Sequence, residues 1–184
     1  MLILLLCPGC AHRYTTKLFK AGVKHCKNGR FEDGRNCLIQ LYHAGDNSYW
    51  VLSALANVYL QLQLYDSAKF FLDKAFVDPR SVQDDNLQSN MAYYLWMNHL
   101  PHEALEHINR AIELKPREAD FYMYRGLVYS DLFYNDLACA DFKKAVELGS
   151  KMTSMNADSL FKEDNCESWV KEELEGVKRR FKPK

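Results

Sequence analysis

Residues 119–152 read ADFYMYRGLVYSDLFYNDLACADFKKAVELGSKM, and the spacing of their side chains decides the fold. The first half places an aromatic, a glycine and an aromatic at intervals of four and three, and the second half places two alanines around a phenylalanine at the same intervals. Side chains at such intervals share one face of an α-helix, so the stretch predicts two amphipathic helices joined by a tight turn. The residues are Tyr122, Gly126 and Tyr129 in the first helix and Ala138, Phe142 and Ala145 in the second.

The same pattern occurs in three more copies towards the N-terminus. In every copy a small residue of the first helix precedes a small residue of the second by twelve positions, and the first members are 34, 36 and 34 positions apart. A fixed period of this length indicates stacked helix-pair repeats. Small residues are expected where two helices cross, because larger side chains hold the axes apart. The pairs are Gly22 with Gly34, Ala56 with Ala68, Ala92 with Ala104, and Gly126 with Ala138.

The pattern predicts four repeats at residues 15–48, 49–84, 85–118 and 119–152. Pro79 and Pro116 follow the second helix of the two middle repeats, because proline cannot continue a helix. Residues 1–14 form an apolar leader, and residues 153–184 are interpreted as a loop followed by a capping helix with a basic tail. This capping helix is predicted at 167–181 from an apolar stripe at helical spacing, made of Trp169, Val170, Leu174, Val177 and Phe181.

Residues 15–152 resemble the tetratricopeptide repeat family. The segments that carry the resemblance are YRGLVY at 124–129, DFKKA at 141–145 and RAIELKP at 110–116. The resemblance implies an all-α fold, a right-handed superhelix of about four helix-turn-helix repeats with a C-terminal capping helix. It also implies a non-catalytic scaffold that binds a protein or peptide partner along a concave groove.

In this family the first helices of successive repeats line the groove. Carried over by template position, the resemblance implies a groove lined by aromatic and amide side chains with few charges. Aromatic side chains in a concave surface favour an apolar helix or an extended peptide as the partner. The alternative is that Trp50 and Trp96 pack between neighbouring repeats. The predicted groove residues are Trp50, Asn57, Asn90, Tyr93, Trp96, Met97, Met123 and Tyr124.

The composition and motifs give no indication of catalysis. Lys plus Arg equals Asp plus Glu at 24 each, whereas a general nucleic-acid binder needs a basic excess to neutralise phosphates. His102 and His107 flank a glutamate, but they are five residues apart, and two zinc ligands on one helix face need a spacing of four. There is no glycine-rich phosphate loop and no nucleophile motif in the sequence. We therefore expect no catalytic residues, no metal and no cofactor.

The N-terminus reads MLILLLCPGC, an apolar run too short to span a bilayer. It resembles the lipobox of bacterial lipoproteins, in which the cysteine after a small residue receives the lipid, here Cys10 after Gly9. The resemblance implies a lipid anchor at Cys10 on the periplasmic side of the cell envelope, with membrane contact only through that lipid. The alternative is a cytosolic adaptor or co-chaperone-like protein with an accidental apolar N-terminus.

Two pairs of cysteines are candidates for a disulfide bond. Cys26 and Cys37 lie on antiparallel helices on opposite sides of the Gly22–Gly34 crossing. Their offset of about seven residues is roughly 10 Å along the axis, more than the ~7 Å that a disulfide tolerates between Cα atoms. We expect no bond between them. Whether Cys139 pairs with Cys166 is left open by the sequence.

Overall fold

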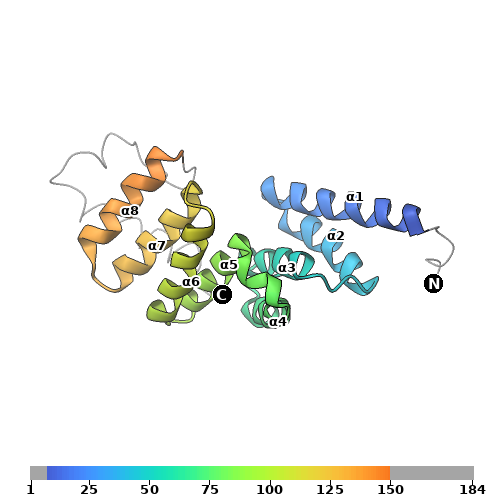
Figure 1. The fold of residues 1–184 in the computed structure, drawn as a ribbon, viewed down its shortest axis with the longest axis horizontal. Helices are drawn as coiled ribbons and strands as arrows, with labels where there is room; N and C mark the ends of the chain where they lie inside the picture. Colours follow the sequence, from blue (N-terminus) through green and yellow to red (C-terminus); the bar gives the residue numbers. More distant parts are fainter. Residues whose placement is uncertain (1–7, 150–184) are drawn as a thin grey trace. The chain divides into compact units, whose positions relative to one another are not determined.

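The structure is a computed structural model that describes residues 8–149, and within this range it is all-helical. The helices form consecutive antiparallel pairs, in which each helix runs back along its partner (Figure 1). The elements are α1 (Pro8–Lys27), α2 (Phe31–His43), α3 (Tyr49–Gln61), α4 (Tyr65–Phe76), the 3₁₀ helix η1 (Pro79–Gln83), α5 (Asp85–Met97), α6 (Pro101–Leu114), α7 (Ala119–Asp131) and α8 (Asn135–Glu147). The all-α prediction is confirmed.

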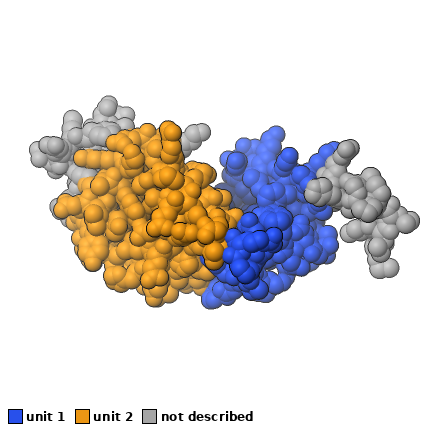
Figure 2. Space-filling view, viewed as in Figure 1, with its two compact units in different colours: residues 1–81 blue, residues 82–184 orange. Residues whose placement is uncertain are grey.

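The chain divides into two compact units, Met1–Ser81 and Val82–Lys184 (Figure 2). In the first unit α1 packs on α2, α3 packs on α4, and α2 also contacts α3. In the second unit α5 pairs with α6, α7 pairs with α8, and α6 contacts α7. Each unit therefore contains two helix pairs. The second helix of the first pair contacts the first helix of the second pair.

Helices α3, α5 and α7 begin at Tyr49, Asp85 and Ala119, the first residues of the predicted repeats. Helix α1 differs, because it already includes Pro8 and so contains the last part of the predicted leader. Proline fits the first turn of a helix, where its missing N–H would have no intrahelical partner. The predicted loop and capping helix at 153–184 lie outside the described residues.

In all four helix pairs the first helix is joined to the second by the same type of turn. The residue that ends this turn has a positive φ in every pair: +74° at Gly29, +60° at Gln63, +61° at His99 and +61° at Phe133. The amide of the following residue donates to a carbonyl five residues earlier, as in Leu64 N to Tyr59 O at 2.9 Å. This is the Schellman ending, which satisfies carbonyls that the helix leaves without partners. Glycine adopts this conformation without strain, and the other three turns accept a side chain there.

The predicted crossing residues lie where the helices of a pair approach most closely. The alanines Ala56, Ala68, Ala104 and Ala138 are fully buried. A Cβ at Gly22 would lie 3.0 Å from Leu38 Cγ, and one at Gly126 would lie 2.6 Å from Phe142 Cε1. At these two crossings the position therefore admits only a very small residue, as the repeat pattern predicted.

A half-buried ion pair ties the helices of the second unit together. Arg125 on α7 donates from Nε and Nη2 to the two carboxylate oxygens of Asp141 on α8, at 2.7 and 2.8 Å. Its Nη1 donates to Asn109 Oδ1 on α6 at 2.8 Å. The carboxylate of Asp141 raises the pKa of Arg125, and such a two-pronged arrangement is geometrically specific as well as strong.

Asp84 caps the start of α5. Its side chain accepts a hydrogen bond from the Leu87 amide at 2.7 Å, which satisfies a donor that the first helical turn leaves without a partner. Burial raises the pKa of Asp84, because the surroundings disfavour its charged form. The cap therefore fixes the first residue of the third repeat.

Candidate partner-binding surface

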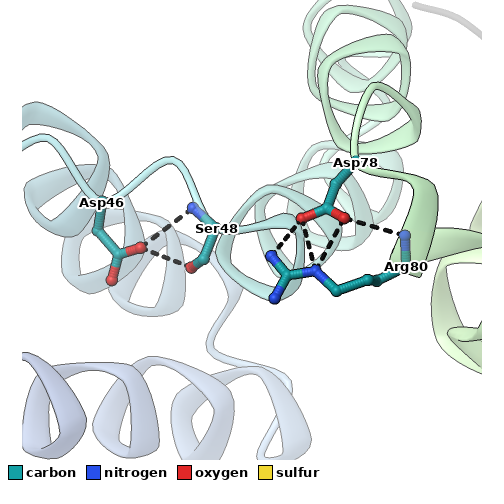
Figure 3. A network of polar contacts seen from close by, with 4 residues as sticks. All are labelled: Asp46, Ser48, Asp78 and Arg80. Carbon is teal, nitrogen blue, oxygen red and sulfur yellow. Dashed lines mark hydrogen bonds and ion pairs between the residues drawn. The ribbon is translucent and has the colours of Figure 1, made fainter.

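The first turn of α3 presents two aromatic side chains. The Asp46 side chain accepts hydrogen bonds from the amide and the hydroxyl of Ser48, the residue immediately before α3 (Figure 3). This turn places Tyr49 and Trp50 at the start of the helix, with their rings edge to face and 5.1 Å apart. Trp50 is 46% exposed, whereas the next two residues of the helix, Val51 and Leu52, are buried.

Arg80 completes this surface from the segment after α4. Its guanidinium lies 5.9 Å from the centre of the Tyr49 ring, within the range of a cation–π interaction. Asp78 accepts hydrogen bonds from the Arg80 amide at 2.9 Å and from its Nε and Nη2 at 3.0 and 2.6 Å (Figure 3). The guanidinium thereby lowers the pKa of Asp78 to about 2, and the pair holds Arg80 beside Tyr49.

We call Tyr49, Trp50 and Arg80 the Trp50 surface. Tryptophan, tyrosine and arginine are the residue types that dominate the energetics of protein interfaces. The repeat template predicted Trp50 but not Arg80, because Arg80 lies in η1, between repeats, where the helical period gives no information. The one sequence signal for it is an arginine two residues after an aspartate at the end of a helix.

The predicted groove residues of the second unit have a different environment. Tyr93 and Trp96 are each 5% exposed, and Asn90 and Met123 are also buried. Trp96 Nε1 donates to the carboxylate of Asp131 on α7, and the rings of Tyr93 and Tyr124 lie 5.4 Å apart. The structure therefore brings Tyr93, Trp96 and Tyr124 together as a contact between α5 and α7.

Two of these residues keep some exposure. Met97 and Tyr124 are partly buried, and burial raises the pKa of Tyr124, with Asp120 adding to the effect. In the first unit Asn57 is likewise partly buried and has a bonding partner. The burial of Trp96 supports the alternative in which it packs between repeats, whereas the exposure of Trp50 supports the binding interpretation. A groove that uses all eight predicted residues stays a prediction.

The structure shows the environment of His107, Cys26 and Cys37, which the sequence offered as possible metal ligands or disulfide partners. His107 Nδ1 lies 2.7 Å from Gln88 Oε1, and burial lowers the pKa of this histidine. Cys26 and Cys37 are free thiols, which confirms that they do not pair. In the part of the chain that the structure describes, no three histidine, cysteine or acidic side chains lie close enough to hold a metal ion. Between residues 8 and 149 no helix is long and apolar enough to cross a membrane.

Consecutive antiparallel helix pairs with one turn geometry define a helical repeat protein. Residues 51–76 and 119–149 match the family model described as "Tetratricopeptide repeat", so the chain carries tetratricopeptide repeats. These stretches contain most of α3 and α4 and all of α7 and α8. The resemblance is thereby confirmed for the second and fourth predicted repeats.

Solved structures support the same fold. The chain is similar to TTC0263, a thermophilic TPR protein of Thermus thermophilus, with a TM-score of 0.66, 19% identity, and 91% of this chain and 89% of that chain covered. A crystal structure of MamA protein matches with a TM-score of 0.57, 19% identity, and 90% and 91% of the two chains covered.

One curated protein shares a short stretch. A UDP-N-acetylglucosamine--peptide N-acetylglucosaminyltransferase of Giardia intestinalis (strain ATCC 50803 / WB clone C6) is 46% identical over 46 residues. The match covers 25% of this chain and spans only 3% of that relative's length.

Proposed function

We propose that this protein is a non-catalytic scaffold that binds a protein or peptide partner through its repeats, with the Trp50 surface as the anchor point. The observation that carries the proposal is the exposure of Trp50 beside an arginine that Asp78 holds in place. A large, rigid and half-exposed side chain loses little conformational entropy on binding and offers much apolar area. The tetratricopeptide repeats support the proposal, since helical repeat stacks provide extended binding surfaces.

Replacing Trp50 by Ala is expected to weaken binding of a peptide selected on this protein by roughly 30-fold, the loss typical of a central interface tryptophan. The peptide is selected from a phage-displayed random library on the purified protein, and its affinity is measured by fluorescence anisotropy. The control variant is Phe70→Ala, which removes an aromatic side chain of similar exposure, 50%, from the same unit. A peptide that binds the Trp50→Ala variant as tightly as the unmodified protein would remove the Trp50 surface from the proposal.

We also propose that Cys10 carries a lipid that anchors the scaffold in the cell envelope of a bacterium. The lipobox-like sequence before Cys10 supports this, and Cys10 lies in the first turn of α1. A protein tethered at this end would hold its repeats close to the membrane surface, where they could assist assembly of a larger complex.

Cells that express the protein with a clickable fatty acid should yield a labelled band, and Cys10→Ser should abolish the label. Cys26→Ser is the control, because Cys26 is a free thiol in the first helix pair. A protein that stays unlabelled and fractionates with the cytosol would favour the alternative, an adaptor of the same fold without a lipid.

A further inference from the structure

The outer side of α8 has the features of a surface that receives another helix. Cys139 and Val146 each lie 34 residues after a residue of α6, Leu105 and Ile112 respectively. On α6, Leu105 and Ile112 pack against a buried cluster that includes Phe121, a residue of the following helix α7. Cys139 and Val146 therefore occupy the positions of α8 that correspond to the α6 residues in contact with α7. A helix that follows α8 in the repeat register would contact them.

Cys139 is disulfide-bonded. The sequence has six cysteines, and Cys26 and Cys37 are free thiols, which leaves Cys7, Cys10 and Cys166 as partners. Of these three, Cys166 is the nearest to Cys139 in the sequence, 27 residues away. The loop that this bond closes is also far shorter than a loop to either N-terminal cysteine, so the entropy cost of closing it is smaller.

We propose that a Cys139–Cys166 disulfide fastens the C-terminal segment of this chain to α8. The occupant of the α8 surface is then residues 167–181, whose apolar stripe begins at Trp169, three residues after Cys166. From Gly149, the chain must return roughly 15 Å to reach the level of Cys139, at 1.5 Å per helical residue. The intervening residues can span about 50 Å when extended, so the chain is long enough.

The bond forms by thiol–disulfide exchange. The two thiols of Cys139 and Cys166 lose two electrons and two protons, and a disulfide of an oxidoreductase or of oxidised glutathione is reduced to two thiols. The reverse reaction, with a dithiol reductant, frees the segment. The contact between the segment and α8 is therefore covalent under oxidising conditions and depends on apolar packing alone under reducing conditions.

Tryptic mapping under non-reducing conditions identifies the partner directly. We expect one linked species that joins residues 126–143 to residues 163–171, and its separation into two peptides after reduction. A link from 126–143 to residues 1–13 would overturn the proposal, and so would a free Cys139 thiol in protein oxidised with glutathione.

Thermal unfolding tests whether the bond stabilises the fold. Reduction should lower the Tm by roughly 10 °C, the size expected from releasing a closed loop of this length in a domain of about 100 residues. Cys166→Ser should show the lowered Tm without reductant and no further change with it, whereas Cys37→Ser should behave as the unmodified protein. A Tm that reductant leaves unchanged would contradict the proposal.

Substitution of a charged residue into the apolar stripe of residues 167–181 tests whether this segment packs on α8. In the reduced protein, Leu174→Asp should lower the Tm by several degrees, because it places a carboxylate in an apolar contact. Ser168→Asp introduces the same residue on the opposite face of the predicted helix and should leave the Tm within about a degree. Equal effects of the two variants would overturn the packing of the stripe.

Discussion

Replacing Trp96 by Ala is expected to destabilise the second unit by about 3–5 kcal/mol, the loss typical of a large buried aromatic side chain. Trp96 is only 5% exposed, its ring lies 5.9 Å from that of Tyr93, and its Nε1 donates to Asp131 on α7. Truncation would leave a cavity between α5 and α7 and would remove a hydrogen bond to a charged group. Denaturant unfolding followed by circular dichroism measures the loss.

Trp50 provides the control for this prediction within the same chain. It is the same residue type but 46% exposed, so Trp50→Ala should cost less than about 1 kcal/mol. Trp96→Phe should fall between the two, because it keeps most of the apolar contact and loses the hydrogen bond. If Trp96→Ala unfolds at the same denaturant concentration as the unmodified protein, Trp96 is not a packing residue, and the binding interpretation of that position gains support.

The contrast between the two tryptophans shows what the repeat register can predict. The register fixes the angle at which a side chain leaves its helix, because the period of the helix is constant and the turn within each helix pair is the same. It therefore predicted the starts of α3, α5 and α7 and the small residues at the crossings. The angle does not determine which residue lies opposite that side chain. Trp96 Nε1 donates to the carboxylate of Asp131, 35 positions away, and the repeat pattern gives no indication of this acceptor.

The residues between repeats could not be predicted for a related reason. Arg80 belongs to a short 3₁₀ helix, where neither the 3.6-residue period nor the 34-residue period applies. Its position depends on Asp78, which accepts from both its amide and its guanidinium. Such local side-chain to backbone contacts stabilise a loop conformation without leaving a pattern in the sequence.

Gly126→Ala is expected to destabilise the second unit by about 1–3 kcal/mol, even though alanine favours a helix over glycine by about 1 kcal/mol. A Cβ at this position would lie 2.6, 2.8 and 3.0 Å from three atoms of the Phe142 ring. Phe142 is fully buried, so its ring has no free space into which it could move. Phe142→Ala should cost more, about 3–5 kcal/mol, because it empties the same site.

The other repeats indicate which second change should restore stability. The residue 16 positions after the small residue is Leu72 after Ala56 and Ile108 after Ala92, both fully buried. In the second and third repeats alanine is thus paired with an aliphatic side chain, whereas glycine is paired with Leu38 in the first repeat and with the larger Phe142 in the fourth. Gly126→Ala combined with Phe142→Leu should therefore recover to within about 1 kcal/mol of the unmodified protein, a coupling energy of about 1–3 kcal/mol between neighbours. Additive losses in chemical denaturation of the two single variants and the double variant would show that the two side chains do not share one space, and that glycine is required at position 126 for another reason.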